Sequence, residues 1–491
     1  GILNDLSDGD NYTLRTNVSD AAGNAATVNT GTSFKYDRTP PSISAVAITG
    51  EDGIQNNFLN VGDNVSVTVT FSENSPVTGT PQLTLAVGDE NQPANYTSSG
   101  NGGTTLVFQY MIQAEDNDTN GISIRANALA LDNGTIMDLA ENNAIRTHSV
   151  VDNNSSYKVD TTAPSVDNFT LSDTALKAGD NATVTLRFSE AVASFSSAAD
   201  ITADNGTLAA MSSADNITWT GTFTPTANTE DASNTLSLAT SYTDTAGNAG
   251  PAATTANYEV ETLAPTVNSV AISSASGVQN SLLNAGDNVS VTATFSESVI
   301  VDNASGTPTL TLVVGSDNRT STYTSGSGST PLVFQYTIQA GETDADGISI
   351  EANTLALNSG TIRDAAGNNA TITYSSVSAN TSYKVDNTAP SVDNFTLSDT
   401  ALKAGDTATV TLRFSEAVAS FASGDDITVA SGSGSLANMT SVDNVTWAGT
   451  FTPTANTEDD NNTLSLATSY TDTAGNAGPT ATTENYAVST L

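Results

Sequence analysis

Residues 60–73 read NVGDNVSVTVTFSE, and this stretch decides the fold. Val65, Val67 and Val69 alternate with serine and threonine, which is the period of a β-strand that buries one face and exposes the other. Nearly the same letters, NAGDNVSVTATFSE, return at residues 284–297, and ATVTLRFSE occurs twice more. Turns of the type Gly-Asp, Asp-Asn-Gly and Gly-Asn separate such runs, and no stretch has a helical period. We therefore expect an all-β chain.

The spacing of these strands indicates how they are arranged. Short strands rich in Val, Thr and Ser, in units of about 100 to 125 residues, favour antiparallel Ig-like β-sandwiches. Trp219 and Trp447 occupy matching places and are interpreted as core anchors, with ligand stacking as the alternative. The predicted fold class is all-β, with tandem Ig-like antiparallel β-sandwich domains in a linear rod.

Internal repetition divides the chain into alternating long and short units. The stretch SVDNFTLSDTALKAGD occurs letter for letter at residues 165–180 and 391–406 and marks the short unit. LVFQY, at residues 106–110 and 332–336, marks the long unit. A unit of this size closes its own core, so the period indicates a string of whole domains and not a solenoid. We expect the C-terminal part of a preceding Ig-like domain at 1–40, long Ig-like domains at 41–163 and 265–389, and short ones at 164–264 and 390–491.

Proline-containing phrases separate the predicted domains. They read YDRTPP, VDTTAP, VETLAP and VDNTAP and begin at Tyr36, Val159, Val260 and Val385. Each proline fixes its own φ and restrains the residue before it, so we expect short, stiff joints. The last residues, AVSTL, stop inside such a phrase, and we expect both ends to be cut from something longer.

Composition restricts the setting and the partners. The chain has no cysteine, so these sandwiches lack the disulfide of antibody domains. It has no apolar run of about 18 residues and no signal-peptide pattern at Gly1, which indicates a soluble fragment without its targeting segments. Its 53 acidic residues against 13 basic ones give a formal charge of −40. Such a charge is repelled by nucleic acid and by anionic membranes, so we expect neither as a partner and no membrane insertion.

Acidic residues recur at fixed places in the units. Glutamate ends each FSE strand, aspartate opens each D-x-A-x-N turn, and an acid stands in each joint. If the fold brings these three places to one pole, three carboxylates converge where one domain meets the next. Ca²⁺ takes about six to eight oxygen ligands and would offset the repulsion among them. The alternative is that these residues are ordinary turn formers and solvated strand ends. The predicted calcium ligands are the strand-end residues Glu73, Glu190, Glu297 and Glu416, the turn residues Asp138, Asp244, Asp364 and Asp472, and the joint residues Asp37, Asp160, Glu261 and Asp386.

A second acidic pattern lies inside each long unit. Asp116, Asp118 and Asn120 read D-x-D-x-N-G with the following glycine, and the copy at 342–347, which contains Asp344 and Asp346, reads E-x-D-x-D-G. This spacing is that of the first half of an EF-hand loop. The twelfth position is asparagine, and no helices flank the loop, so it is not an EF-hand. A weak calcium loop and a simple acidic hairpin tip both remain open.

Joints of the form D-x-T-x-P, the FSE strand and the D-x-A-G-N turn together resemble the bacterial Ig-like repeats that build the extender regions of giant surface adhesins. Such repeats are similar to cadherin ectodomains in architecture and in calcium dependence. The resemblance implies an extracellular rod on the bacterial cell surface, rigidified by calcium at its joints, that holds a binding module away from the cell. Glu261 departs from the joint pattern, and Ser489 lacks the carboxylate, so long-to-short joints are expected to bind calcium more tightly than the reverse.

Catalysis finds little support in the sequence. The chain has one histidine, His148, and neither a cysteine nor a Gly-x-Ser-x-Gly elbow. No repeated set of residues could therefore act as a Ser/His or Cys/His nucleophile. We expect no enzyme. The predicted function is a non-catalytic adhesin stalk, and the alternative is a structural subunit of an extracellular sheath, surface layer or filament. Besides calcium ions, the candidate partners are neighbouring copies of the chain and cell-surface glycans.

Overall fold

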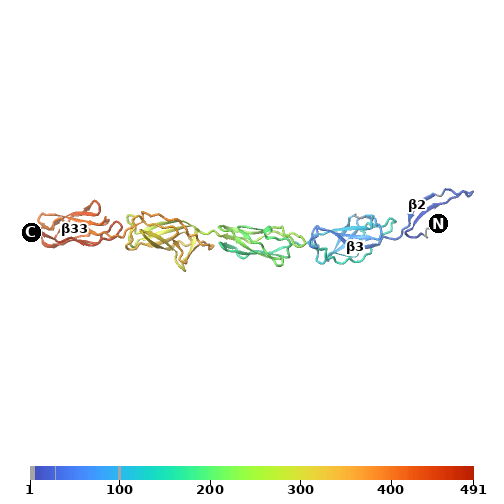
Figure 1. Cartoon of the computed structure of the whole chain (residues 1–491), viewed down its shortest axis with the longest axis horizontal. Helices are drawn as coiled ribbons and strands as arrows, with labels where there is room; N and C mark the ends of the chain where they lie inside the picture. The colour runs from blue at the N-terminus through green and yellow to red at the C-terminus, as the bar shows by residue number, and fades with distance from the viewer. Residues whose placement is uncertain (1–5, 28, 98–100) are drawn as a thin grey trace. The chain divides into compact units, whose positions relative to one another are not determined.

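The computed structural model of the chain describes residues 6–27, 29–97 and 101–491. In Figure 1 the described backbone is coloured by residue number, from blue near the N-terminus to red at the C-terminus. The chain divides into two compact units, and each is described by itself. Unit 1 consists of Gly1–Leu176, Asp180–Thr226 and Asp231–Val260, and unit 2 consists of Lys177–Gly179, Ala227–Glu230 and Glu261–Leu491.

The strands of unit 1 form a hairpin followed by two sandwiches, which we call long domain 1 and short domain 1. The hairpin consists of β1 (Asn11–Thr16) and β2 (Asn29–Lys35). Long domain 1 contains β3 (Ile43–Asp52), β4 (Phe58–Leu59), β5 (Asn64–Phe71), β6 (Val77–Thr78), β7 (Gln82–Val87), β8 (Glu90–Tyr96), β9 (Thr105–Met111), β10 (Asn117–Asp118), β11 (Ser123–Ala130), β12 (Thr135–Ile136) and β13 (Lys158–Asp160). Short domain 1 contains β14 (Val166–Leu171), β15 (Ala175–Lys177), β16 (Ala182–Phe188), α1 (Ser197–Asp200), β17 (Ile201–Ala203), β18 (Gly206–Leu208), β19 (Thr218–Pro225), β20 (Glu230–Asn234), β21 (Leu236–Leu238), β22 (Ala253–Thr254) and β23 (Tyr258–Glu261).

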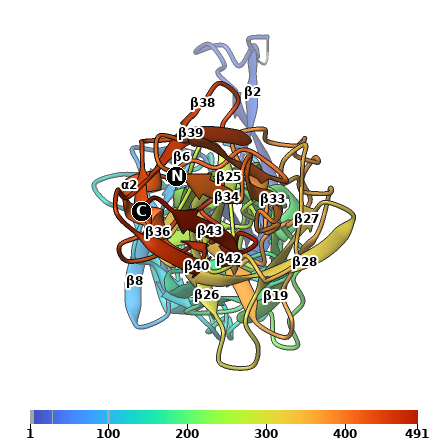
Figure 2. The ribbon, with the colours of Figure 1, turned by 90° about the vertical axis from the view of Figure 1, so that its left-hand side faces the viewer.

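Unit 2 repeats this order in long domain 2 and short domain 2. Long domain 2 contains β24 (Val267–Ser276), β25 (Leu282–Leu283), β26 (Asn288–Asp302), β27 (Thr309–Val314), β28 (Asp317–Ser325), β29 (Ser329–Thr337), β30 (Leu355–Ala356), β31 (Thr361–Arg363) and β32 (Lys384–Val385). Short domain 2 contains β33 (Val392–Leu397), β34 (Ala401–Lys403), β35 (Ala408–Phe414), α2 (Ser423–Asp426), β36 (Ile427–Val429), β37 (Gly434–Leu436), β38 (Thr440–Ser441), β39 (Thr446–Pro453), β40 (Glu458–Asn462), β41 (Leu464–Leu466), β42 (Ala481–Thr482) and β43 (Tyr486–Ser489). Figure 2 labels most of this last set together with α2.

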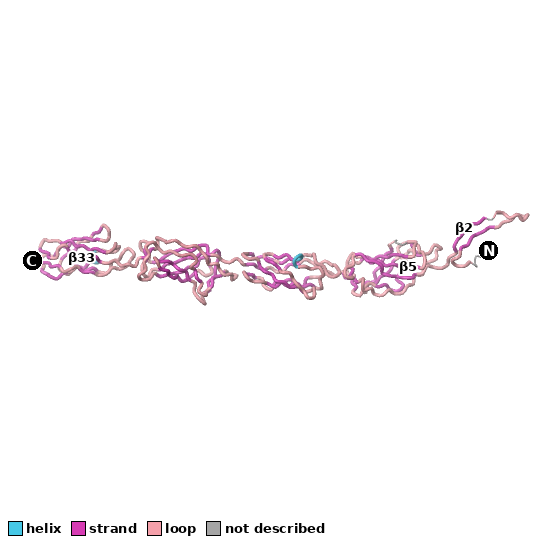
Figure 3. The backbone as a smooth tube through the Cα atoms, in the orientation of Figure 1, coloured by secondary structure: helices cyan, strands magenta, loops and turns pink. Residues whose placement is uncertain are grey.

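The all-β class is confirmed, and the alternating sequence is the reason for it. Along β5 every second residue is buried, from Val65 at 0% exposure to Phe71 at 2%, as the period of two predicted. In Figure 3 the domains consist of strands joined by loops. The described helices are α1 and α2, and each has four residues. None of the described helices has the length and apolar character needed to cross a membrane.

Each domain has its own hydrophobic core. Four separate clusters of buried side chains span residues 59–159, 169–260, 272–385 and 395–488. In the short domains the cluster includes aromatic contacts: Phe195 meets Trp219 edge-on at a centroid distance of 4.9 Å, and Phe421 meets Trp447 in the same way. Both tryptophans therefore pack against the core, as the sequence indicated. The exact domain boundaries stay a prediction.

In both long domains and in short domain 2, the last strand pairs with a short early strand. Long domain 1 is built on the antiparallel sheet β11-β7-β8-β9-β5-β3, while its last strand, β13, pairs in parallel with the short early strand β4. The pairs β25–β32 and β34–β43 are parallel in the same way. In the long domains the joint acid stands at the end of this last strand or directly after it: Asp160 ends β13, and Asp386 follows β32.

Candidate metal centres at the joints

The D-x-A-x-N turns build one corner of each centre by local hydrogen bonding. In the turn that Asp244 opens, Oδ1 accepts the backbone N–H of Ala246 at 2.8 Å and of Asn248 at 2.9 Å. Asn248 Nδ2 donates to Asp244 Oδ2 at 2.8 Å. Asp20 and Asn24 make the same contacts in an exposed turn, so the five-residue sequence is sufficient for this geometry.

At the four joints, the asparagine also ties the turn to the joint. Asn248 Nδ2 donates a second hydrogen bond, to the backbone carbonyl oxygen of Asp160, at 2.9 Å. The turns at the other three joints repeat this contact. Asn142 donates to Asp37 O at 3.2 Å, Asn368 to Glu261 O at 2.8 Å and Asn476 to Asp386 O at 2.8 Å. We missed this role in the sequence, although the asparagine recurs in every turn of this type.

The carboxylates converge at three of the four joints. Among the described residues, three groups of acids each offer one carboxylate oxygen within 4.8 Å of the other two. The turn aspartate is the buried member of each group, and the joint acid and strand-end glutamate are half-buried. These groups are Asp37, Glu73 and Asp138 (the Asp37 triad), Asp160, Glu190 and Asp244 (the Asp160 triad), and Asp386, Glu416 and Asp472 (the Asp386 triad).

Burial and the convergence of three carboxylates are electrostatically unfavourable, and they raise the pKa of Glu190 and of Glu416. Burial, and then repulsion from Asp160 and Asp244, raises the pKa of Glu190 above its ordinary value of 4.5. The pKa of Glu416 is raised by burial and then by Asp386 and Asp472. Among the described residues, no hydrogen bond contributes to the pKa shift of either carboxylate. Within that part of the chain, both glutamates therefore stand among like charges that no donor offsets.

The Asp37 triad differs from the other two because a lysine reaches it. Lys35 Nζ lies 3.5 Å from Asp37 Oδ2. Burial, and then repulsion from Asp37 and Asp138, raises the pKa of Glu73 above its ordinary value, and the positive charge of Lys35 opposes this rise. A cleft of about 590 Å³ adjoins this triad and is lined by Lys35, Asp37, Glu73 and Asp138 among others. The corresponding Lys158 lies over the ring of Phe58 instead, 5.4 Å from its centroid.

The joint at Glu261 is the exception. Glu261 Oε1 accepts the backbone N–H of Leu263 at 3.0 Å, and burial is the main cause that raises its pKa. The pKa of Glu297 is raised by burial and then by Asp364. These three acids are close enough to affect one another, but within the described ranges they do not form a group with all three oxygens inside 4.8 Å.

The acids of the predicted loop in long domain 1 are occupied by hydrogen bonds. The buried Asp116 accepts from the Tyr110 hydroxyl at 2.6 Å, the Gln113 backbone at 2.8 Å and Gln92 Nε2 at 2.9 Å. Asp118 accepts the backbone N–H of Gly88 at 2.9 Å and of Gly121 at 2.8 Å, and that of Asn120 at 3.1 Å.

The copy in long domain 2 is built alike. The buried Glu342 bonds with Tyr336, Arg319 and the Gln339 backbone, and Asp344 accepts from Gly315 and Gly347. Asp346 is exposed. The acid groups found within the described residues include none of these side chains, so the contacts favour the structural hairpin tip over a calcium loop.

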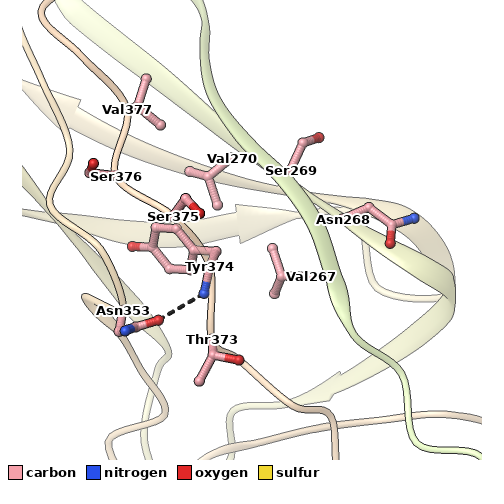
Figure 4. A pocket seen from close by; sticks show the side chains of 10 residues that line it. All are labelled: Val267, Asn268, Ser269, Val270, Asn353, Thr373, Tyr374, Ser375, Ser376 and Val377. Carbon is pink, nitrogen blue, oxygen red and sulfur yellow. Dashed lines mark hydrogen bonds between the residues drawn. The ribbon is translucent and has the colours of Figure 1, made fainter.

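Hollows elsewhere in the long domains have a different character. Figure 4 shows one of about 580 Å³ in long domain 2, where Asn353 Oδ1 accepts the backbone N–H of Tyr374 at 2.8 Å. Its lining residues include no carboxylate, histidine, lysine or arginine. The counterpart in long domain 1 contains His148, whose Nε2 accepts the Ala128 N–H at 2.9 Å while Nδ1 donates to Ser149 O at 2.8 Å. Both ring nitrogens are thus engaged with backbone groups, as expected for a structural residue.

Comparisons with known proteins address the domains directly. A family model described as "Bacterial Ig-like domain" matches residues 160–260 and 386–488. A comparison with curated proteins gives no match. Among solved structures, the Escherichia coli adhesin FdeC is 13% identical over 66% of this chain and 96% of its own, with a TM-score of 0.28.

Two further solved structures are similar at the same low level. Invasin, described as a bacterial integrin-binding protein, is 10% identical over 86% of this chain and 75% of its own, with a TM-score of 0.24. The eight N-terminal Ig domains of the Down syndrome cell adhesion molecule are 12% identical over 99% of this chain and 53% of their own, with a TM-score of 0.20. Identities and TM-scores this low carry no argument about function. The assignment of the domains therefore rests on the strand architecture and on the match to the family model. Residues 160–260 and 386–488 match the bacterial Ig-like domain family, and they lie in a tandem array of all-β Ig-like sandwiches.

Proposed function

We propose that this chain is a non-catalytic extender of a bacterial surface adhesin, located outside the cell, and that calcium ions bound at its joints hold successive domains in fixed orientations. The observation that carries the proposal is the convergence of joint, strand-end and turn carboxylates in the three triads. An extender requires independent cores in tandem, which this chain has, and stiff joints, which its short proline-containing phrases favour.

The donor set of the triads fits calcium. All three side chains supply carboxylate oxygens, and Ca²⁺ prefers hard oxygen ligands to the nitrogen and sulfur ligands of zinc sites. In the Asp160 triad the turn aspartate already accepts three hydrogen bonds, whereas Glu190 accepts none from the described residues. Glu190 and Asp160 would therefore supply most of the oxygens, and Asp244 would contribute through Oδ2.

Calcium would change the mechanics because each triad joins two domains. Asp160 ends the last strand of long domain 1, whereas Glu190 and Asp244 belong to short domain 1. Without a cation, like charges face each other across the joint and favour orientations that separate them. A bound ion reverses this preference, and the proline-restricted joint leaves few alternative orientations.

Small-angle X-ray scattering of the chain with calcium and with EDTA tests the proposal. With calcium we expect a longer maximum dimension and a narrower distance distribution at unchanged mass, since extracellular calcium modules bind with a Kd of about 10⁻⁴–10⁻³ M. Equal profiles in the two buffers would contradict the calcium-dependent extender. A mass that grows with calcium would instead favour the sheath or filament subunit.

A further inference from the structure

A rigid two-residue turn stands at the end of each long domain that faces the following short domain. In long domain 1, Gln55 and Phe58 exchange backbone hydrogen bonds of 2.8 and 2.7 Å around Asn56 and Asn57. These two asparagines have φ values of +50° and +66°, as in the tight turns of β-hairpins. Long domain 2 repeats the turn, with Asn280 and Ser281 at φ values of +51° and +66°. The conformation is thus fixed before any partner is considered.

This turn and the asparagine that follows it donate hydrogen bonds to the neighbouring short domain. Asn56 Nδ2 donates to the carbonyl oxygen of Thr245, and Asn60 Nδ2 to that of Ala246, both at 2.9 Å. The backbone of Asn60 is held in turn by Asp63, whose Oδ2 accepts its N–H at 2.8 Å.

Unit 2 contains the same contacts. Asn280 donates to Thr473 O and Asn284 to Ala474 O, again at 2.9 Å. We call the two donors Asn56 and Asn60 with the neighbouring Gln55, and the copy formed by Asn280, Asn284 and Gln279, the amide face.

A glycine in the short domain makes this approach possible. A Cβ on Gly247 would lie 2.5 Å from Gln55 Nε2 and 2.9 Å from Asn60 Nδ2, and one on Gly475 would meet Gln279 Nε2 at 2.4 Å. The turn itself tolerates a side chain at this position, because Glu141 occupies it in long domain 1 with a φ of +66°. A side chain at this position would displace the amide groups of Gln55 and Asn60, so the glycine leaves room for the contact with the amide face.

The amide face is separate from the acids of the joint and belongs to the long domains. Its asparagines donate these hydrogen bonds to backbone carbonyl oxygens and not to a carboxylate of a triad. In the short domains the aligned sequence LKAGD replaces LNVGD and LNAGD, so Lys177 and Lys403 stand where Asn60 and Asn284 stand, and the Gln-Asn turn is missing from the sequence.

We propose that the amide face is a recognition surface for the Thr-Ala-Gly segment of the D-T-A-G-N turn of the following short domain, and that it holds long-to-short joints together without calcium. This goes beyond the proposed function, because it requires no bound ion. Each long-to-short joint is then held by two independent sets of contacts, namely the amide hydrogen bonds and the carboxylates that bind calcium.

Distance measurements by electron paramagnetic resonance in EDTA test this proposal on the full chain. The chain has no cysteine, so Thr320→Cys and Thr450→Cys place one spin label in each domain of unit 2 without a background label. We expect a narrow distance distribution that broadens in Asn280→Ala/Asn284→Ala. Two lost hydrogen bonds correspond to a change of about 5-fold to about 150-fold in the ratio of closed to open joints.

Two further variants separate the contact from other effects. Gly475→Ala removes no donor but obstructs the approach, so it should broaden the distribution in the same direction. Asn303→Ala changes an exposed asparagine of the same long domain and should leave the distribution unchanged.

A distribution that is already broad in the parent chain in EDTA, or one that neither variant changes, would overturn the proposal. Because no calcium is present, the result is independent of whether the triads bind an ion.

Discussion

The joints at Asp160 and Asp386 and the joint at Glu261 use the same three kinds of acid, yet only the first two bring them within 4.8 Å in the described structure. In each case the joint acid accepts a backbone N–H two residues ahead, from Thr162, Thr388 or Leu263. The local turn is therefore shared, and the difference lies in the longer glutamate side chain and in the domain that follows. Recurrence of an acid along the sequence does not by itself give a set of carboxylates with ligand spacing.

Removal of calcium should have the largest effect on stability, and the short domains should be the ones that it destabilises. A site occupied at 100 times its Kd stabilises the folded state by about 2.7 kcal/mol. Since about 1 kcal/mol corresponds to about 4–8 °C for a domain of this size, EDTA should lower Tm by about 10 °C or more. Trp219 and Trp447 lie in the short domains and are the only tryptophans of the chain, so their fluorescence reports these transitions. An unchanged fluorescence melting curve in EDTA would contradict the stabilising role of the ion.

Neutralising the strand-end glutamate should separate the two kinds of joint. Glu416→Gln removes a ligand from the Asp386 triad, so the calcium-dependent rise in Tm of short domain 2 should disappear, whereas Tm in EDTA should increase because repulsion is relieved. Glu297→Gln should change the calcium response little. Glu484→Gln, an exposed glutamate of the same short domain, is the matched control. Equal effects of Glu416→Gln and Glu297→Gln would remove the distinction between the joints.

The bridging asparagine should matter more at a joint than in an isolated turn. Asn248→Ala removes the bonds to Asp244 Oδ2 and Asp160 O and should cost about 1–2 kcal/mol of unfolding free energy. Asn24→Ala removes one bond in an exposed turn and should cost less than about 0.5 kcal/mol. Urea unfolding, followed for Asn248→Ala by Trp219 fluorescence and for Asn24→Ala by circular dichroism, gives the two values. A cost as small for Asn248→Ala as for Asn24→Ala would show that the bond across the joint contributes nothing.

The strands and the meeting of acids could be predicted from sequence, but the contacts that fix them could not. The alternation in β5 is local, so its buried face follows from the letters alone. Asp160, Glu190 and Asp244 were expected together because each recurs at a strand end, a turn or a joint, and that a cation binds them stays a prediction. The bond from Asn248 to the Asp160 carbonyl depends on how two domains pack, which no local pattern contains.

The acids at 116 to 118 show what a local spacing leaves open. The spacing allowed both a weak calcium loop and an acidic hairpin tip. Asp116 accepts hydrogen bonds from Gln92 and Tyr110, and Asp118 accepts one from Gly88, and these partners lie on or next to neighbouring strands. Hydrogen bonds from residues distant in the sequence cannot be read from a six-letter motif.

The pH dependence should have opposite signs with and without calcium. The raised pKa of Glu190 and Glu416 means that the folded state favours the protonated form. In EDTA this stabilisation is fully present below the ordinary value of 4.5 and is lost as pH rises through the raised value, so stability should increase on acidification in that window. Calcium binds the carboxylates, so the rise in Tm that it causes should shrink as pH falls through the same window. Melting curves from pH 7 to about pH 4.5 in both buffers check the sign. A calcium effect that does not depend on pH would exclude these glutamates as ligands.

The smallest expected effect comes from repairing the exceptional joint. Glu261→Asp gives the joint the acid found at Asp160 and Asp386 and should add a weak calcium response in long domain 2, of about 1 kcal/mol or less. The reciprocal Asp386→Glu should weaken the response of short domain 2 by a similar amount. Calcium-dependent hydrogen exchange at the joint residues would resolve both changes. If Glu261→Asp alters nothing while Asp386→Glu does, the following domain and not the joint acid determines the site.

Calorimetric titration of calcium into the intact chain tests the central claim most directly. The account predicts saturable binding of calcium at the three triads, with a Kd of about 10⁻⁴–10⁻³ M. The number of bound ions should fall in Glu190→Gln/Glu416→Gln, which leaves the Asp37 triad intact, and should stay unchanged in Glu297→Gln. Absence of saturable heat in the wild-type chain, or identical binding in the double variant, would contradict it.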